Sequence, residues 1–373
     1  MISDDLREKI REQFVSRSGP SRLSREEIRD RITCGEVISN SDCSDMDLSD
    51  MEMSGGIFEQ VDFRNANLSG ARLNESIFLK SNFIGANLVG TNMHLAVFNE
   101  CQFNHARLGK ANLAVAKFVD TDFSFSDLSG ADLTLASFVQ SDLSNVNLSS
   151  AQLSRTAFLD SILANADLSH ANCEQSMFVG IDFTTITIIQ ATFRQVLLFN
   201  TCFAGMDLQG MNFTMSQFNG SDLKGTDLSN ANLTQASFMD ADLSGANLEN
   251  IQANMALFMK TKMTQATLKG AVLKQSVLQE ADLTLADFRE VDMEACACKS
   301  AICRGTQFVK ANLKDCDFSH ADLSGADMTL ANLFRTKLHQ IIEESTSWTL
   351  ANKEAALGTD PELAAGEQWQ PAM

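Results

Sequence analysis

A five-residue period runs through most of this chain and restricts its fold more than any other feature of the sequence. Every fifth position from Leu48 to Leu338 is Leu, Phe, Met or Ile, except at Cys173, Ala253 and two further cysteines, Cys298 and Cys303. A small residue usually stands two positions before each of these large ones. A phase held over roughly 290 residues indicates a repeat protein, in which one structural unit is copied along the chain.

A second period of twenty residues shows how the quintets group. Phe recurs at this spacing from Phe58 to Phe178, and the next quintet repeats Phe from Phe63 to Phe123. If four quintets form one coil, residues twenty apart stack on neighbouring coils. One coil cannot bury a core alone, whereas stacked coils share a continuous one. We therefore predict that the large and small repeat positions point inward and that the other three positions of each quintet point outward.

Individual quintets resemble a known family. The runs Ala66-Asn67-Leu68-Ser69-Gly70 and Ala241-Asp242-Leu243-Ser244-Gly245 resemble the A(D/N)LXX consensus of the pentapeptide-repeat family, and the resemblance covers about residues 46–340. It implies an all-β solenoid, a right-handed quadrilateral β-helix of about 14–15 coils with short α-helical caps at both ends. At about 4.8 Å per coil, such a rod would be roughly 70 Å long.

The flanks do not follow the repeat. We predict an N-terminal helical cap over 1–45, the repeat over 46–340, and a helix and tail over 341–373. Apolar spacing favours a helix over 4–15, Ser24-Arg-Glu-Glu27 is a capping-box pattern that opens a second helix, and 345–356 is a further candidate. The end, with Pro361, is predicted to be loop or tail. Capping of the solenoid and docking or oligomerisation are the alternative roles of these flanks.

Charge and composition exclude several classes of protein. The formal charge of −19 argues against direct contact with nucleic acid or an anionic membrane, since both are usually bound through basic patches. No apolar run approaches the roughly 18 residues that a membrane span needs, and the N-terminus has no apolar signal region. The nine cysteines are too irregular for a disulfide scaffold, so we expect reduced thiols and a cytoplasmic protein.

No pattern of catalytic residues stands out. The histidines are predicted to lie scattered on outward positions, and no glycine-rich phosphate loop or GxSxG motif occurs. We therefore expect neither enzymatic activity nor a cofactor, a metal or a small-molecule substrate. Cys296, Cys298, Cys303 and Cys316 fall on inward positions, which favours core filling over metal binding. The histidines are His94, His105, His170, His320 and His339.

Outward positions beside the Phe58 column are unexpectedly apolar. We name this set the apolar wall and predict that it binds a protein partner or a second copy of the chain, because monomers rarely expose large apolar patches. Coverage by a flank or by neighbouring side chains is the alternative. The wall comprises Ile57, Ile77, Leu79, Val97, Val119, Val139, Leu159, Met177, Val179, Leu197, Phe199, Met239, Leu257, Met259 and Val277, and the adjacent corner adds Leu95, Val115, Leu135, Met215 and Met255.

Two further faces are acidic. Local hydrogen bonding of Asp near turns is one explanation. The other is mimicry of DNA, as in family members that resemble a duplex and bind type II topoisomerases such as gyrase. Residues 46–340 carry 32 acids and 20 bases; that is about one net charge per 6 Å, against one per ~1.7 Å in DNA. The faces comprise Asp62, Asp122, Asp127, Asp142, Asp167, Asp182, Asp207, Asp222, Asp227, Asp242, Asp282, Asp287, Asp322 and Asp327.

Two short segments resemble a particular branch of the family. Gly35-Glu36-Val-Ile-Ser and Ala331-Asn-Leu-Phe-Arg-Thr-Lys337 are similar to the ends of pentapeptide-repeat proteins that accompany type VI secretion clusters. This resemblance implies an accessory role as an adaptor or chaperone. The sequence thus predicts a non-enzymatic binding scaffold, with the acidic DNA mimic as the alternative. Residues 181–211 carry bulky side chains where small ones are expected, which predicts a wider or bent coil there.

Overall fold

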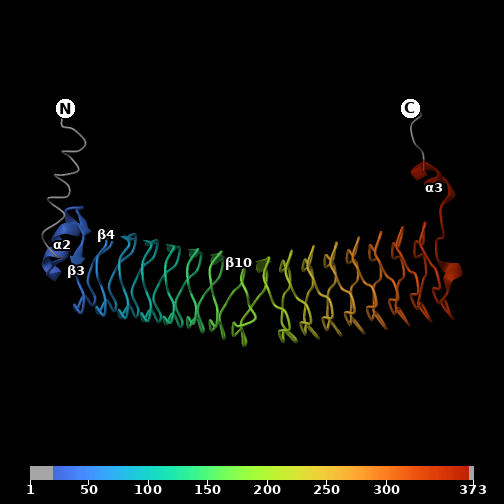
Figure 1. Ribbon diagram of the computed structural model, residues 1–373, viewed down its shortest axis with the longest axis horizontal. Helices are drawn as coiled ribbons and strands as arrows, with labels where there is room; N and C mark the ends of the chain where they lie inside the picture. The colour runs from blue at the N-terminus through green and yellow to red at the C-terminus, as the bar shows by residue number, and fades with distance from the viewer. Residues whose placement is uncertain (1–19, 369–373) are drawn as a thin grey trace, which may run out of the picture. The chain divides into compact units, whose positions relative to one another are not determined.

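A computed structural model describes residues 20–368 of the chain. These residues form two compact units, 20–152 with 165–169, and 153–164 with 170–368. Both units are built from the same short coil, which Figure 1 shows repeated along the chain. The two units are described separately below.

The first unit begins with β1 (Ser21–Arg22) and α2 (Arg25–Thr33). The predicted capping box is present, since the Ser24 side chain accepts the Glu27 N–H and the Glu27 side chain accepts the Ser24 N–H. Strand β1 pairs in parallel with β3, and a second parallel series runs from β2 to β8. The strands are β2 (Val37–Ser39), β3 (Ser41–Asp42), β4 (Ile57–Glu59), β5 (Ile77–Leu79), β6 (Val97–Asn99), β7 (Lys117–Val119) and β8 (Ser137–Val139).

The second unit contains β9 (Ala157–Leu159), β10 (Met177–Val179) and β11 (Leu197–Phe199), again paired in parallel at a spacing of twenty residues. Single parallel bridges continue this register from Leu197 with Gln217 to Lys337 with Leu357. The 3-10 turn η1 (Lys353–Ala355) and the helix α3 (Pro361–Gln368) follow. None of the helices within residues 20–368 is long and apolar enough to cross a membrane.

Each coil has four corners. In one coil of the first unit, Asn65, Gly70, Glu75 and Lys80 all have left-handed backbone conformations, with φ of 56°, 67°, 60° and 52°. This conformation turns the chain by a corner after every quintet. Four corners per twenty residues give a four-sided coil, so each unit is a parallel β-solenoid, and the predicted fold class is confirmed.

The core is a set of stacked columns. The rings of Phe58, Phe78 and Phe98 are nearly parallel, with centroids 4.7 and 4.9 Å apart, and all three are buried. The adjacent column stacks Phe63 on Phe83 at 4.9 Å. Rings of the two columns meet edge to face, an arrangement that the ring quadrupoles favour. The predicted stacking of residues twenty apart is thereby confirmed.

The C-terminal flank differs from the prediction. The expected helix over 345–356 is wrong, because Ser347 and Leu357 still form bridges with the preceding coil and only 353–355 makes a 3-10 turn. The helix lies further on and begins at Pro361, since proline fits the first helical position and Asp360 accepts the next free N–H groups. The helix predicted over 4–15 lies outside the described residues. The domain bounds at 46 and 340 stay a prediction.

The stacked rings predict a large effect of one core substitution. Replacing Phe78 by Ala should lower the free energy of unfolding by about 3–5 kcal/mol, because it opens a cavity between two stacked rings. Phe125→Ala, at an exposed corner of the same unit, is the control and should change stability by about 0.5 kcal/mol or less. Thermal unfolding followed by circular dichroism measures both. Equal losses would contradict the stacked core.

Candidate binding surfaces

The apolar wall of the first unit follows the strand register. Ile57 pairs with Ile77 and Ile77 with Val97, while Val119 pairs with Val139. All five side chains are partly exposed, so they point outward and cover one another only in part. Lys117 interrupts one row and Asn99 the other. The wall is therefore a set of apolar patches with polar breaks.

The second unit repeats this arrangement. Leu159, Val179 and Phe199 form one row across β9, β10 and β11, and Met177 lies beside Leu197 in the other. The remaining members of the wall are also partly exposed; they are Met239, Leu257, Met259 and Val277. Gln217 and Ser237 separate Leu197 from Leu257 in the bridge register. Every predicted wall residue thus lies at the surface of its own unit. Partner binding by the wall stays a prediction.

The corner beside the wall carries apolar side chains, although both its exposure to water and its left-handed backbone conformation disfavour them. Leu95 and Leu135 are 43% and 50% exposed and have φ of 60° and 61°, in the left-handed region that favours Gly or Asn. The β-branched Val115 has φ of 62° in the same column. Met215 and Met255 occupy this corner in the second unit and are similarly exposed. These side chains extend the apolar surface beside the wall, although exposed apolar residues also occupy left-handed corners elsewhere, as at Phe125 and Leu285.

The predicted acidic faces have a local structural role. The Oδ1 of each aspartate accepts the backbone N–H of the residue two positions later, as in Asp227 with Ser229 at 2.9 Å. This is the Asx-turn hydrogen bond, which closes a corner. The acceptors are Asp62, Asp122, Asp127, Asp142, Asp167, Asp182, Asp207, Asp222, Asp227, Asp242, Asp282, Asp287, Asp322 and Asp327.

Cations lie among these aspartates. Arg64 pairs with Asp62 and Arg289 with Asp287, each at 2.6 Å, and Lys224 lies 3.2 Å from Asp222. The Arg289 hydrogen bond lowers the pKa of Asp287, and the Ser229 backbone N–H lowers the pKa of Asp227. The acidic faces are therefore partly neutralised, and the carboxylate oxygens have a structural use as acceptors in the corners.

This role predicts a contrast between two variants of Asp227. Asp227→Ala removes the acceptor of the Ser229 N–H and of the Asn247 side-chain amide, and should lower stability by about 1 kcal/mol. Asp227→Asn keeps an acceptor oxygen and should lose less than half as much. Urea unfolding of both proteins makes the comparison. An equal loss in the two variants would show that the carboxylate charge matters and the hydrogen bond does not.

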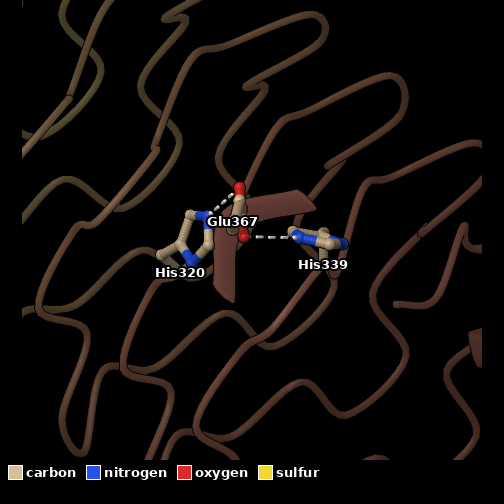
Figure 2. A group of neighbouring side chains, drawn as sticks. All are labelled: His320, His339 and Glu367. Carbon is tan, nitrogen blue, oxygen red and sulfur yellow. Dashed lines mark hydrogen bonds and ion pairs between the residues drawn. The ribbon is translucent and has the colours of Figure 1, made fainter. Parts of the chain in front are cut away.

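The structure brings together two histidines that are predicted to lie apart. Glu367 of α3 lies between His320 and His339 (Figure 2), with its Oε1 3.2 Å from His320 Nε2 and its Oε2 3.2 Å from His339 Nε2. The prediction of scattered, outward histidines is wrong for this pair, and His339 is only 4% exposed. No sequence pattern identified Glu367 as a partner of these histidines, because its segment is predicted to be loop or tail.

These groups line a pocket of about 320 Å³ between α3 and the last coils of the second unit. The pocket is also lined by Lys299, Lys337, Asp317, Asp360 and Leu363. The Asp360 N–H donates to Nδ1 of His339 at 3.1 Å, and the hydrogen bond from His339 lowers the pKa of Glu367. Each of His320, His339 and Glu367 offers one atom that could be a metal ligand, and these three atoms lie within 4.8 Å of one another. Within the described residues, this is the group close enough to hold a metal ion.

The four clustered cysteines, Cys296, Cys298, Cys303 and Cys316, have the predicted core role. Cys298 and Cys303 are completely buried, and burial raises the pKa of both thiols, so they stay protonated. Cys296 and Cys316 are also buried and donate to the carbonyl oxygens of Leu273 and Met293, each at 2.8 Å. All nine cysteines are free. The four clustered thiols behave as small core residues.

The irregular coils form a shallow apolar groove. Bulky residues at inward positions, Met206 and Met211, are only partly buried, and Ile189 is exposed. Together with Ile186 and Ile188 they line a hollow of about 420 Å³ in the second unit. The hollow thus lies where the sequence carries oversized side chains at inward positions; a wider or a bent coil stays a prediction.

The contact between Glu367 and the imidazoles predicts an effect of acid. A lowered pKa means that the contact stabilises the docking of α3 above pH 4.5, the ordinary value for Glu, and is lost as the pH falls through the lowered value. The protection of residues 361–368 against hydrogen exchange, taken relative to the unfolded chain at the same pH, should therefore fall below about pH 4.5. In Glu367→Gln this acid step should be absent. An unchanged acid step in that variant would assign it to another group.

Comparison with known proteins identifies the family. The pentapeptide-repeat model matches residues 41–78, 76–114, 116–155, 147–184, 216–251, 256–294 and 301–340. The chain therefore belongs to the pentapeptide-repeat family. The unmatched stretch 185–215 contains all the residues that line the apolar groove.

Several solved structures resemble the chain. A QnrB1 structure, described as a plasmid-mediated fluoroquinolone resistance protein, is 15% identical and covers 52% of this chain and 90% of its own, with a TM-score of 0.41. HetL from Nostoc sp. strain PCC 7120 is 25% identical and covers 83% and 95%, with a TM-score of 0.12. Rfr23 from Cyanothece 51142 is 21% identical and covers 43% and 91%, with a TM-score of 0.13. No curated protein matches the chain.

Proposed function

We propose that this repeat scaffold is a non-enzymatic binding protein, and that its apolar wall binds a protein partner or a second copy of the chain. The supporting observation is the row of partly exposed aliphatic side chains that stack across consecutive strands in each unit. Apolar side chains at this density form the centre of protein interfaces, whereas solvated strand faces are usually polar.

The strained corner supports the same surface. Leu95 and Leu135 occupy left-handed positions next to the wall, where Gly or Asn would fit with less backbone strain and better hydration. A partner that covers these side chains would recover roughly 25 cal/mol for each Å² of apolar surface that it removes from water. The wall and its corner thus form one candidate interface within each unit.

The alternative, an acidic mimic of DNA that binds a type II topoisomerase such as gyrase, has less support. The aspartates of the acidic faces close corners through Asx turns, so their recurrence has a structural explanation. Ion pairs such as Asp287 with Arg289 also reduce the charge of these faces. A type VI secretion adaptor is a more specific form of the proposed scaffold; its partner would be a spike, adaptor or effector protein.

The test compares two double variants of the second unit. Leu159→Asp with Val179→Asp places two charges side by side on the wall, since these residues pair between β9 and β10. Ile162→Asp with Ile189→Asp makes the same chemical change at exposed positions outside the wall. Affinity purification with mass spectrometry detects a partner, and sedimentation velocity detects self-association. The wall variant should weaken the association at least about tenfold, equal to 1.4 kcal/mol.

The control variant should bind like the wild type, and circular dichroism should show both variants folded. Retained association in the wall variant would contradict the proposal. A gyrase supercoiling assay distinguishes the proposed scaffold from the acidic DNA mimic, because the scaffold should leave supercoiling unchanged. Inhibition that persists in the wall variant would favour the acidic mimic.

A further inference from the structure

We propose that the pocket around His320 and His339 is a carboxylate-binding site, which Glu367 of the same chain occupies and which accepts an acidic side chain or a small dicarboxylate when Glu367 swings out. This site lies on the same face as the apolar wall, beyond Val277 in the bridge register, but it does not depend on the function proposed for the wall. The pocket, its two imidazoles and its present occupant all belong to the second unit.

The hydrogen bonds fix the chemistry of the pocket. Because the Asp360 N–H donates to Nδ1 of His339, the proton of the neutral ring is on Nε2, which therefore donates to Oε2 of Glu367. The Nε2 of His320 lies 3.2 Å from the other oxygen, and since an ionised carboxylate oxygen can only accept, this Nε2 must carry a proton to hydrogen-bond there. Two donors thus face the two oxygens of one carboxylate, as Figure 2 shows.

The same contact disfavours a metal ion, although the three groups are close enough to hold one. A metal bound to Nε2 of His339 would move the ring proton to Nδ1, where the Asp360 N–H already points. Lys299 and Lys337 also line the pocket, and their charges repel a cation and attract a carboxylate. Lys337 is partly neutralised by Asp317 at 3.3 Å. The donor set therefore selects an anion.

The pocket is preorganised, whereas its occupant is weakly held. His339 is buried, so packing fixes its ring. Glu367 stands in the last turn of α3, where the helix dipole disfavours a negative charge, and its side chain is 33% exposed. Gly366 precedes it and weakens the helix by about 1 kcal/mol relative to Ala.

The N-terminal part of α3 has its own support. Oδ1 of Asp360 accepts the N–H groups of Glu362 and Leu363. The last turn can therefore open while Asp360 keeps the His339 ring in place. Removing one side chain, that of Glu367, would empty the site without dismantling it.

The experiment uses the full chain with Glu367→Ala and follows the histidine ring signals by NMR. The probes are glutarate, the capped peptide Asp-Pro-Glu-Leu-Ala-Ala-Gly-Glu-Gln, and a control called the Gln peptide, which is the same peptide with both Glu changed to Gln and the Asp changed to Asn. We expect saturable shifts of two ring signals in the variant with glutarate, the acidic peptide or both, and binding at least about tenfold weaker in the wild type, where Glu367 competes at high effective concentration. His320→Ala in the Glu367→Ala background assigns one of the signals.

Saturation by glutarate alone would identify a site for small dicarboxylates, and saturation by the peptide alone would identify a site for acidic segments; each supports the proposal. The Gln peptide should not bind. The proposal is overturned if no carboxylate probe shifts the two signals, or if the Gln peptide binds as well as the acidic one. Binding of one zinc ion by both rings in the wild type would also overturn it, because both Nε2 atoms would then be ligands and not donors.

Discussion

Backbone hydrogen bonds between coils twenty residues apart hold every other feature of each unit in place. In the first unit, the Leu68 N–H donates to the Asn87 oxygen at 2.7 Å and the Asn87 N–H donates back to the Ala66 oxygen at 2.9 Å. This ladder brings identical positions of successive quintets onto one face. Phenylalanines twenty residues apart, from Phe58 to Phe138, therefore stack into one continuous column of the core.

The ladder also separates two kinds of outward residue. Aspartates before the repeat centres accept N–H groups of their own corners, so their recurrence follows from the fold. The aliphatic residues of the wall make no such local contribution, and Leu95 and Leu135 oppose the backbone preference of their corner. We therefore assign the binding role to the wall and a structural role to most of the acidic charge.

The sequence predicted the solenoid because each quintet repeats the same inward pair, so one register error would have broken the whole pattern. It also predicted α2, since Ser24 and Glu27 interact locally. It failed after Leu338, where bridges continue to Leu357 although Leu, Phe, Met or Ile no longer stands at every fifth position. The pocket at His339 could not be predicted, because Glu367 reaches it from a helix whose position depends on tertiary contacts.

The twenty-residue stacking can be tested directly by cross-linking. The side chains of Gln175 and Gln195 meet at one corner of the second unit, where their amides form a hydrogen bond of 2.7 Å. Cysteines at both positions should form a disulfide, because their Cα atoms lie about 4.8 Å apart on neighbouring coils. Cysteines at 175 and 190 lie on different corners and should not. Peptide mapping after mild oxidation gives the answer; cross-linking of the second pair, or failure of the first, would contradict the stacking on which both proposed binding sites depend.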